Sequence, residues 1–243
     1  MRARRGERSE LASKRTPAGR SETRRERNSS DAGTHDRPAE SERVNMDAVR
    51  VITGRAVPLV RSDVDTDQII PSDWLKRVER TGFGAGLFSE WRENSDFVLN
   101  QERYKGANIL VAGSNFGTGS SREHAVWALM DYGFAAVVSS RFADIFRNNS
   151  GKMGLVAATV AQEAVQRLWV AIEEDPDLEV VVDVEHKRVA APAIGLDVPF
   201  EIDDFTQHRL LNGLDDIGLT LAHGDDITTY ESSRADWMPS VRA

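Results

Sequence analysis

The sequence of 243 residues contains no cysteine. Disulfide bonds are therefore excluded, and so is thiolate ligation of zinc or of an iron–sulfur cluster by this chain. No apolar run approaches the roughly 20 residues that a membrane-spanning helix needs. We therefore expect no membrane partner and no metal ligands in this chain, so that any metal required for chemistry must come from another polypeptide.

The first 45 residues lack the material for a hydrophobic core, since they hold one Leu, one Val and no aromatic residue. Such a segment cannot bury enough apolar surface to offset its ordering entropy, and we predict a disordered Arg/Glu/Ser-rich extension over residues 1–45. No apolar segment follows its arginine pairs, which argues against a secretory signal, and its eight acidic residues argue against a transit peptide. We favour Met46 as the true start, residues 46–243 as the folded domain, and a cytoplasmic location.

Basic residues are scarce in residues 46–243, which carry 19 Lys/Arg against 31 Asp/Glu, whereas residues 1–45 carry 12 against 8. A domain this acidic is a poor candidate for nucleic-acid binding. Its overall composition, 40% hydrophobic and 29% charged, is that of an ordinary globular domain with a substantial core. An anionic substrate would have to be attracted locally, by arginines in the site.

Residues 113–125 read GSNFGTGSSREHA and lie between an apolar run at 109–112 and a helical pattern at 126–130. This order predicts a buried strand, a glycine-rich loop and a helix N-terminus. The three glycines allow a tight turn and close approach to a ligand, and the first N–H groups of a helix attract an anion. Together with Arg122, the segment predicts a site for carboxylate or phosphate.

A simpler interpretation is a helix cap. Ser120 and Glu123 have the S-x-x-E spacing of a capping box, with Arg122 then solvated on the outer face of the helix. Three glycines are more than a cap requires, which favours the ligand site. A P-loop is excluded because no Lys-Ser/Thr follows Gly119, and the dinucleotide fingerprint is excluded because its last glycine is replaced by Arg122.

Two further segments carry candidate residues. The acids at 63, 65 and 67 have alternate spacing, but the glycine and closing glutamate of a calcium loop are missing, so we favour a turn that positions Ile69 and Ile70 for burial. Residues 72–91 combine basic, apolar and glycine residues in an irregular stretch. Loops of this kind often select substrates, although each basic residue could equally be solvated.

Hydrophobic periodicity predicts a mixed α/β domain, because an early strand–helix alternation implies parallel pairing and the later strands are spaced like hairpins. We predict strands at 49–60 (broken near Gly54 and Pro58), 109–112, 135–139, 155–160, 178–184, 186–191 and 198–202. The predicted helices are 122–132, 142–149 (ending at Gly151), 161–174 and 203–222, followed by a frayed helix and coil over 225–243.

The loop at 113–125 is similar to the active-site loop of the swivelling domain in the aconitase superfamily. Further motifs follow in the order of one family: DTDQIIP at 65–71, TGFG at 81–84, LF-x-x-W at 87–91 and SRFADIFRNN at 140–149. From about residue 49 to residue 230 the chain resembles the 3-isopropylmalate dehydratase small-subunit family.

This resemblance implies a three-layer β/β/α swivelling fold and a hydro-lyase that isomerises 2-isopropylmalate to 3-isopropylmalate in leucine biosynthesis. It also implies a heterodimer with a large subunit that carries a [4Fe–4S] cluster, no cofactor bound by this chain, and a small dicarboxylate substrate.

By the same resemblance, Ser120 is the catalytic base, acting as an alkoxide, and Arg122 grips a substrate carboxylate bidentately. The expected substrate-binding residues are Gly119, Ser121, Asp65, Thr66, Lys76 and Arg77. His124 is interpreted as a structural partner rather than a proton-transfer group.

Two alternatives stay open. A related hydro-lyase acting on homoaconitate or a methyl-substituted malate would differ in residues 72–88, where the arginine register after Trp74 mildly disfavours a tricarboxylate. A chain of a different class would be a free-standing anion-binding or regulatory module.

Overall fold

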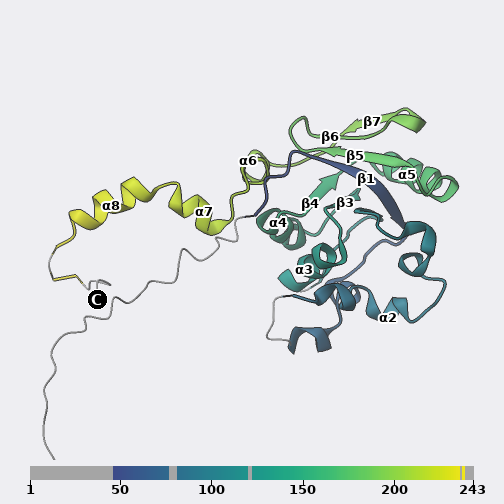
Figure 1. Cartoon of the computed structure of the whole chain (residues 1–243), viewed down its shortest axis with the longest axis horizontal. Coiled ribbons are helices and arrows are strands. Elements are labelled where there is room, and N and C mark those ends of the chain that lie inside the picture. The colour runs from purple at the N-terminus through teal and green to yellow at the C-terminus, as the bar shows by residue number, and fades with distance from the viewer. Residues whose placement is uncertain (1–45, 77–80, 120–121, 236, 239–243) are drawn as a thin grey trace, which may run out of the picture. The chain divides into compact units, whose positions relative to one another are not determined.

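The structure is a computed structural model that describes residues 46–76, 81–119, 122–235 and 237–238 (Figure 1). Its contacts separate residues 1–43 from residues 44–243, and the fold below is that of the second unit. The extension predicted at 1–45 lies outside the described residues, as do Arg77, Ser120 and Ser121.

The second unit is built on a mixed sheet of seven strands in the order β4-β3-β2-β1-β5-β6-β7. Strands β1 to β4 pair in parallel, whereas β1, β5, β6 and β7 pair in antiparallel fashion. The predicted mixed α/β fold is confirmed. The strands are β1 (Val51–Leu59), β2 (Ile109–Ala112), β3 (Ala136–Ser139), β4 (Val156–Thr159), β5 (Glu179–Asp183), β6 (Arg188–Ala191) and β7 (Leu196–Pro199).

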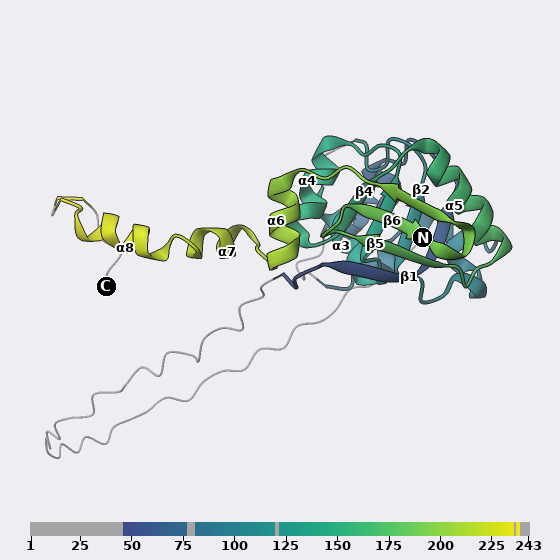
Figure 2. The ribbon, with the colours of Figure 1, turned by 90° about the horizontal axis from the view of Figure 1, so that it is seen from above.

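The strand pairing divides the fold into two β layers and a helical layer. Figure 1 shows the antiparallel strands β5 to β7 above the parallel strands β3 and β4, with helices α3 (Glu123–Tyr132) and α4 (Asp144–Met153) beneath. Seen from above, β5 and β6 lie in front of β2 and β4 (Figure 2). Helix α5 (Gln162–Glu174) packs against β1, β2 and β3. Two β layers and a helical layer are the arrangement expected of a swivelling domain.

Strand β1 belongs to both halves of the sheet. Residues 51–55 pair with β5 and residues 56–59 pair with β2, so the predicted break near Gly54 and Pro58 is wrong. At Gly54 the side-chain amide of Asn108 occupies the space that a Cβ would need, since an added Cβ would lie 1.9 Å from its Oδ1. Pro58 lies beyond the pairing with β5, where a missing N–H costs no hydrogen bond on that side.

The core lies where the parallel strands are covered on both faces. Every residue of β2 and β3 is buried, as is typical of parallel strands covered on both faces. Helix α5 lies where a helix was predicted at 161–174 and buries one face, because Val165, Leu168 and Ile172 are fully buried and Nε1 of Trp169 donates to the carbonyl of Val111 at 2.9 Å. No helix of the described residues is long and apolar enough to cross a membrane.

Several boundaries differ from the sequence prediction. The helix predicted at 203–222 is two helices, α6 (Asp204–Asn212) and α7 (Asp216–Leu221), because Gly213 adopts φ 62° and Asp215 accepts a hydrogen bond from the N–H of Gly218. Both are ordinary stop and start signals. Helix α4 continues through Gly151 to end at Gly154, and the last strand ends at Pro199.

The remaining elements are short or C-terminal. The helices are α1 (Thr66–Ile69), α2 (Ser89–Arg92) and α8 (Gly224–Ser232), and α8 lies where a frayed helix was predicted. The 3-10 turns are η1 (Ser72–Lys76), η2 (Phe83–Gly86), η3 (Val98–Asn100), η4 (Glu102–Tyr104) and η5 (Pro192–Ile194).

Candidate functional site

The candidate site is built where the loops after β1 and β2 are hydrogen-bonded to each other. The N–H of Gly113 donates to the carbonyl of Arg61 at 2.9 Å, and the N–H of Asp63 donates to the carbonyl of Ser114 at 2.8 Å. The carboxyl ends of neighbouring parallel strands meet at one edge of a sheet, which is where α/β proteins commonly bind ligands. The glycine-rich loop is therefore held at that edge by backbone bonds.

The same pairing continues to α1. The N–H of Gly117 donates to the carbonyl of Val64 at 2.8 Å, and the N–H of Thr66 donates to the carbonyl of Thr118 at 2.9 Å. Asp65 forms a capping box with Gln68 at the start of α1. The backbone of Val64 and Thr66 thus holds the glycine-rich loop against the start of α1, and Asp65 caps that helix.

The predicted turn after Thr66 is confirmed. Ile69 and Ile70 are fully buried behind the capping box, so the alternate acids at 63, 65 and 67 belong to a turn that directs two apolar side chains into the core. Within the described residues, no group of three or more His, Cys, Asp or Glu side chains is placed to hold a metal ion.

Two glycines in the loop have backbone conformations that other residues rarely adopt. Gly117 has φ +77°, and a Cβ there would lie 2.3 Å from Cγ of Phe146, so no side chain fits. Gly119 has φ +98° but is exposed, and its nearest neighbour, Oγ1 of Thr66, would be 3.4 Å from an added Cβ. Gly117 therefore fits the loop against α4, while Gly119 is required by its left-handed backbone and not by a close neighbour.

Arg122 is the N-cap of α3, and its side chain is only 20% exposed. Its Nη1 donates to Oδ1 of Asp67 on α1. The guanidinium is therefore fixed beside the glycine-rich loop and is not simply solvated. Ser120, the N-cap of the alternative capping-box interpretation, lies outside the described residues. The N-cap of α3 is Arg122 and its first helical residue is Glu123, whereas a capping box would need Glu123 at the third helical position.

Asp67 is a residue of the site that the sequence analysis did not select. It lies within the DTDQIIP motif, one helical position from Thr66, and its carboxylate is 58% exposed. The sequence contained a signal for Asp67. A largely buried arginine needs a hydrogen-bond acceptor, and the acidic DTDQIIP motif could supply one. Its distance in sequence from Arg122 concealed the pairing.

His124 has the structural contacts that were expected of it. Its ring meets Phe83 edge-on at 5.3 Å between centroids and Trp127 at 4.6 Å. Phe83 belongs to the TGFG motif, and its N–H donates to Oδ2 of Asp131 at 2.9 Å. Helix α3 thus carries Arg122 at its start and holds the 81–86 segment along its length.

The structure brings only some of the predicted substrate-binding residues together. Lys76 lies in η1 with its side chain 80% exposed, and its ion-pair partner among the described residues is Asp73 at 3.0 Å. The ring of Trp74 in the same turn packs closely over Gly86. The structure therefore brings Asp65, Thr66, Gly119 and Arg122 together, while Lys76 contacts its own turn.

The arrangement suits an anion. Arg122 supplies a planar, permanently charged group with five N–H donors, of which one contacts Asp67. Gly119 is exposed and has a left-handed backbone, so its main chain is accessible to a ligand beside Asp65 and Thr66. A carboxylate bound there would meet a fixed cation and the positive end of a helix dipole.

Comparisons with known proteins identify the family of this chain. The family model described as the aconitase C-terminal domain matches residues 46–163, and the model for the C-terminal domain of the 3-isopropylmalate dehydratase small subunit matches residues 216–239. The 3-isopropylmalate dehydratase small subunits of Frankia alni and Rubrobacter xylanophilus are 60% and 58% identical over 196 residues, which is 81% of this chain and 100% of each relative.

A solved structure extends the likeness to three dimensions. The crystal structure of 3-isopropylmalate dehydratase from Methanocaldococcus jannaschii has a TM-score of 0.56 at 25% identity, covering 74% of this chain and 99% of that chain. The full-length match to the curated relatives, together with the shared fold, shows that this chain belongs to the 3-isopropylmalate dehydratase small-subunit family.

Proposed function

We propose that this chain is the small subunit of a cytoplasmic 3-isopropylmalate dehydratase, which converts 2-isopropylmalate to 3-isopropylmalate by removing water and adding it back in the other orientation. The observation that carries the proposal is the guanidinium of Arg122, fixed by Asp67 at the start of α3, in a chain 60% identical to named small subunits.

Arg122 has the role of a carboxylate clamp in this proposal. Removing a proton from the carbon next to a carboxylate pushes negative charge onto the carboxylate oxygens, so a preorganised cation there lowers the barrier. Asp67 holds Nη1, which leaves the remaining N–H donors of the guanidinium for substrate. Lysine could supply the charge but not the bidentate geometry.

We assign Ser120 as the base, acting through its alkoxide. The alkoxide takes the proton from the substrate carbon during dehydration and returns a proton during rehydration. A serine alkoxide is unfavourable in water, and it would be stabilised by the guanidinium of Arg122 and by N–H groups at the start of α3. Ser121 and the backbone of Gly119 would add hydrogen bonds to the substrate.

The remaining predicted contacts take two roles. Asp65 and Thr66 shape the site, since their described bonds brace the loop against α1. Lys76 or Arg77 would contact the second carboxylate from the 72–82 segment. The apolar side chains of the same segment would then contact the isopropyl group.

This chain does not fit an iron–sulfur cluster, because it has no cysteine to supply thiolate ligands. We therefore place the [4Fe–4S] cluster, whose Lewis acidity assists loss of the hydroxyl group, on a large subunit that completes a heterodimer.

Reconstitution with the large subunit tests the proposal. Ser120→Ala is expected to abolish isomerisation of 2-isopropylmalate while leaving the circular dichroism spectrum and subunit association unchanged; Ser95→Ala, at an exposed serine in the loop after α2, is the matched control. Full activity of Ser120→Ala would refute the assignment. A substrate panel decides specificity: preference for homoaconitate or a methyl-substituted malate would indicate a related hydro-lyase, and no turnover with any of them would indicate a binding module.

A further inference from the structure

A groove of about 750 Å³ lies on the same unit, between residues 46–49, α3, α4 and the start of α7. Its apolar lining includes the side chains of Met46, Met130, Phe134, Met153 and Ile217. Met130 is 37% exposed and Ile217 is 68% exposed, so this apolar surface faces solvent in the isolated chain. Contiguous exposed apolar surface of this kind is typical of interaction sites.

Helix α3 contributes Glu123 and Met130 to the lining of the groove, and Gly133, which caps α3, also lines it. Glu123 directly follows Arg122 in the chain, so the lining of the groove includes the neighbour in sequence of a candidate site residue. A partner that covers Arg122 and extends over the first turn of α3 would therefore also meet this groove.

The C-terminal helices extend the same surface. The large apolar side chains of α7 and α8 are exposed: Ile217 by 68%, Leu221 by 52%, Ile227 by 39% and Tyr230 by 64%. Their spacings of four and three residues place each pair on one face of its helix. Helices of six and nine residues are marginal without tertiary packing, and the hydrogen bonds of α8 between described residues are local.

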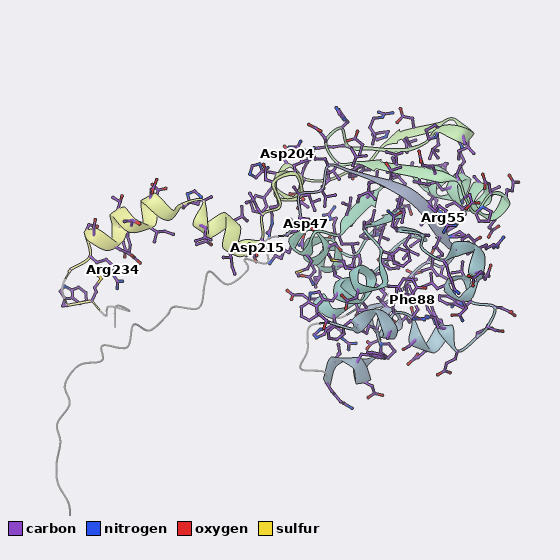
Figure 3. The ribbon with its side chains drawn as sticks, in the orientation of Figure 1. Asp47, Arg55, Phe88, Asp204, Asp215 and Arg234 are labelled. Atoms are coloured by element: carbon purple, nitrogen blue, oxygen red, sulfur yellow. The ribbon has the colours of Figure 1, made fainter. Side chains whose placement is uncertain are left out.

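The charge of the surface indicates the chemistry of its partner. The groove is lined by four carboxylates, Asp47, Glu123, Asp215 and Asp216, and by one ammonium group, Lys152. In Figure 3, Asp47 and Asp215 lie beside each other near the start of α7. Residues 216–232 add acids at 225, 226 and 231 and contain no Lys or Arg. A second copy of this chain would bring like charges together, whereas a basic partner would be attracted.

We propose that the groove along α3 and the exposed faces of α7 and α8 form one docking surface for the large subunit, which presents apolar side chains bordered by Lys or Arg. The occupant follows from continuity, because the subunit that completes the site at Arg122 must cover the N-terminal end of α3, and Glu123 at that end lines the groove. The inference rests on the proposed function for the identity of the partner.

The test measures affinity for the large subunit separately from catalysis. Met130→Glu and Leu221→Glu place a carboxylate in each half of the surface, and Val170→Glu is the matched control because Val170 is an apolar residue of α5 that is 57% exposed. Each surface variant should bind the isolated large subunit about tenfold more weakly or worse, while Val170→Glu binds normally. The affinity of the unmodified chain should fall as salt rises.

Catalysis distinguishes docking from the active site. At saturating large subunit, both surface variants should regain the unmodified kcat and KM, since neither residue is placed in the catalytic machinery. Because Leu221 is half exposed, its variant should also retain the unmodified melting temperature.

Unchanged affinity of both surface variants would overturn the inference. Weakened self-association with unchanged affinity for the large subunit would also overturn it and would identify a second copy as the occupant. A complex that forms normally but does not isomerise isopropylmalate would refute the proposed function and leave the docking surface intact.

Discussion

Nη1 of Arg122, at the start of α3, is hydrogen-bonded to Oδ1 of Asp67 on α1, a residue 55 positions earlier in the chain. The pair joins the loop after β2 to the helix after β1, so it orients the guanidinium and fastens two segments of the site together. Because Asp67 remains 58% exposed, its Coulomb attraction to Arg122 is partly screened by water, and its main effect is on geometry.

Asp67→Asn should therefore impair catalysis more than it impairs folding. The amide can still accept a hydrogen bond but loses the charge that orients Arg122, and we expect kcat/KM to fall roughly 10- to 100-fold. Asp177→Asn is the control, because Asp177 forms a similar exposed pair with Arg55 at 3.0 Å in the antiparallel half of the sheet. Equal kinetics for the two variants would show that Asp67 does not position the guanidinium.

Arg122→Lys should be severe although it keeps the positive charge. An ammonium group cannot contact Asp67 and a substrate carboxylate with one rigid fork, so we expect kcat to fall about 10²–10³-fold. Steady-state kinetics of the reconstituted enzyme measure this effect. Near-normal kinetics would indicate that the arginine contributes charge alone.

Gly117→Ala should destabilise the fold. The added Cβ would meet the ring of Phe146 at 2.3 Å with φ held at +77°, and we expect a loss of about 2–5 kcal/mol in the free energy of unfolding. Gly195→Ala is the comparison, because Gly195 also has positive φ but an added Cβ there would have no neighbour within 4 Å. This variant should lose only about 1–2 kcal/mol in the free energy of unfolding. Urea denaturation of both variants measures the difference, and equal losses would exclude the steric explanation.

Ser139→Ala should loosen the start of the glycine-rich loop. The buried hydroxyl of Ser139, at the end of β3, lies 2.6 Å from the carbonyl of Gly113 and 2.9 Å from that of Arg141. Losing it leaves a buried carbonyl without its donor, which costs about 1–3 kcal/mol. Amide hydrogen exchange in residues 113–117 should accelerate more than exchange in β6; uniform acceleration would mean a global loss of stability without a specific effect on the loop.

The turn between β5 and β6 should show a pH dependence of its own. The ring of His186 hydrogen-bonds to Asp183 at 2.8 Å, and this contact raises the pKa of His186 above 6.5. Partial burial raises the pKa of Asp183, but hydrogen bonds from the backbone N–H and the ring of His186 outweigh it, so that pKa lies below 3.8.

The directions of these two pKa shifts define the pH range in which the pair stabilises the fold. The contribution of His186 is complete below pH 6.5 and is lost as the pH rises through its raised pKa, whereas that of Asp183 is present above pH 3.8 and is lost as the pH falls through its lowered pKa. Asp183→Asn should return the pKa of His186 towards 6.5 in an NMR titration. An unchanged His186 titration curve in that variant would exclude the pairing in solution.

The sequence by itself determined most of the local structure. Apolar runs such as 109–112 and 135–138 predicted buried strands, and α5 follows from a 3.6-residue period. The missing cysteines excluded thiolate ligation of a cluster by this chain, and the GSNFGTGSSREHA segment predicted an anion site between a strand and a helix. Gly213 and Asp215 also marked the boundary between α6 and α7, although the apolar period across them favoured a single helix.

Only the tertiary structure decided which distant segments meet. Strand β1 changes partner between Arg55 and Ala56, and Arg122 finds its acceptor on α1. Local periodicity reports which face of an element is apolar, but not which element covers it. Contacts across 55 residues depend on strand order and on how the loops after neighbouring strands pair, and these are set by the packing of the whole domain.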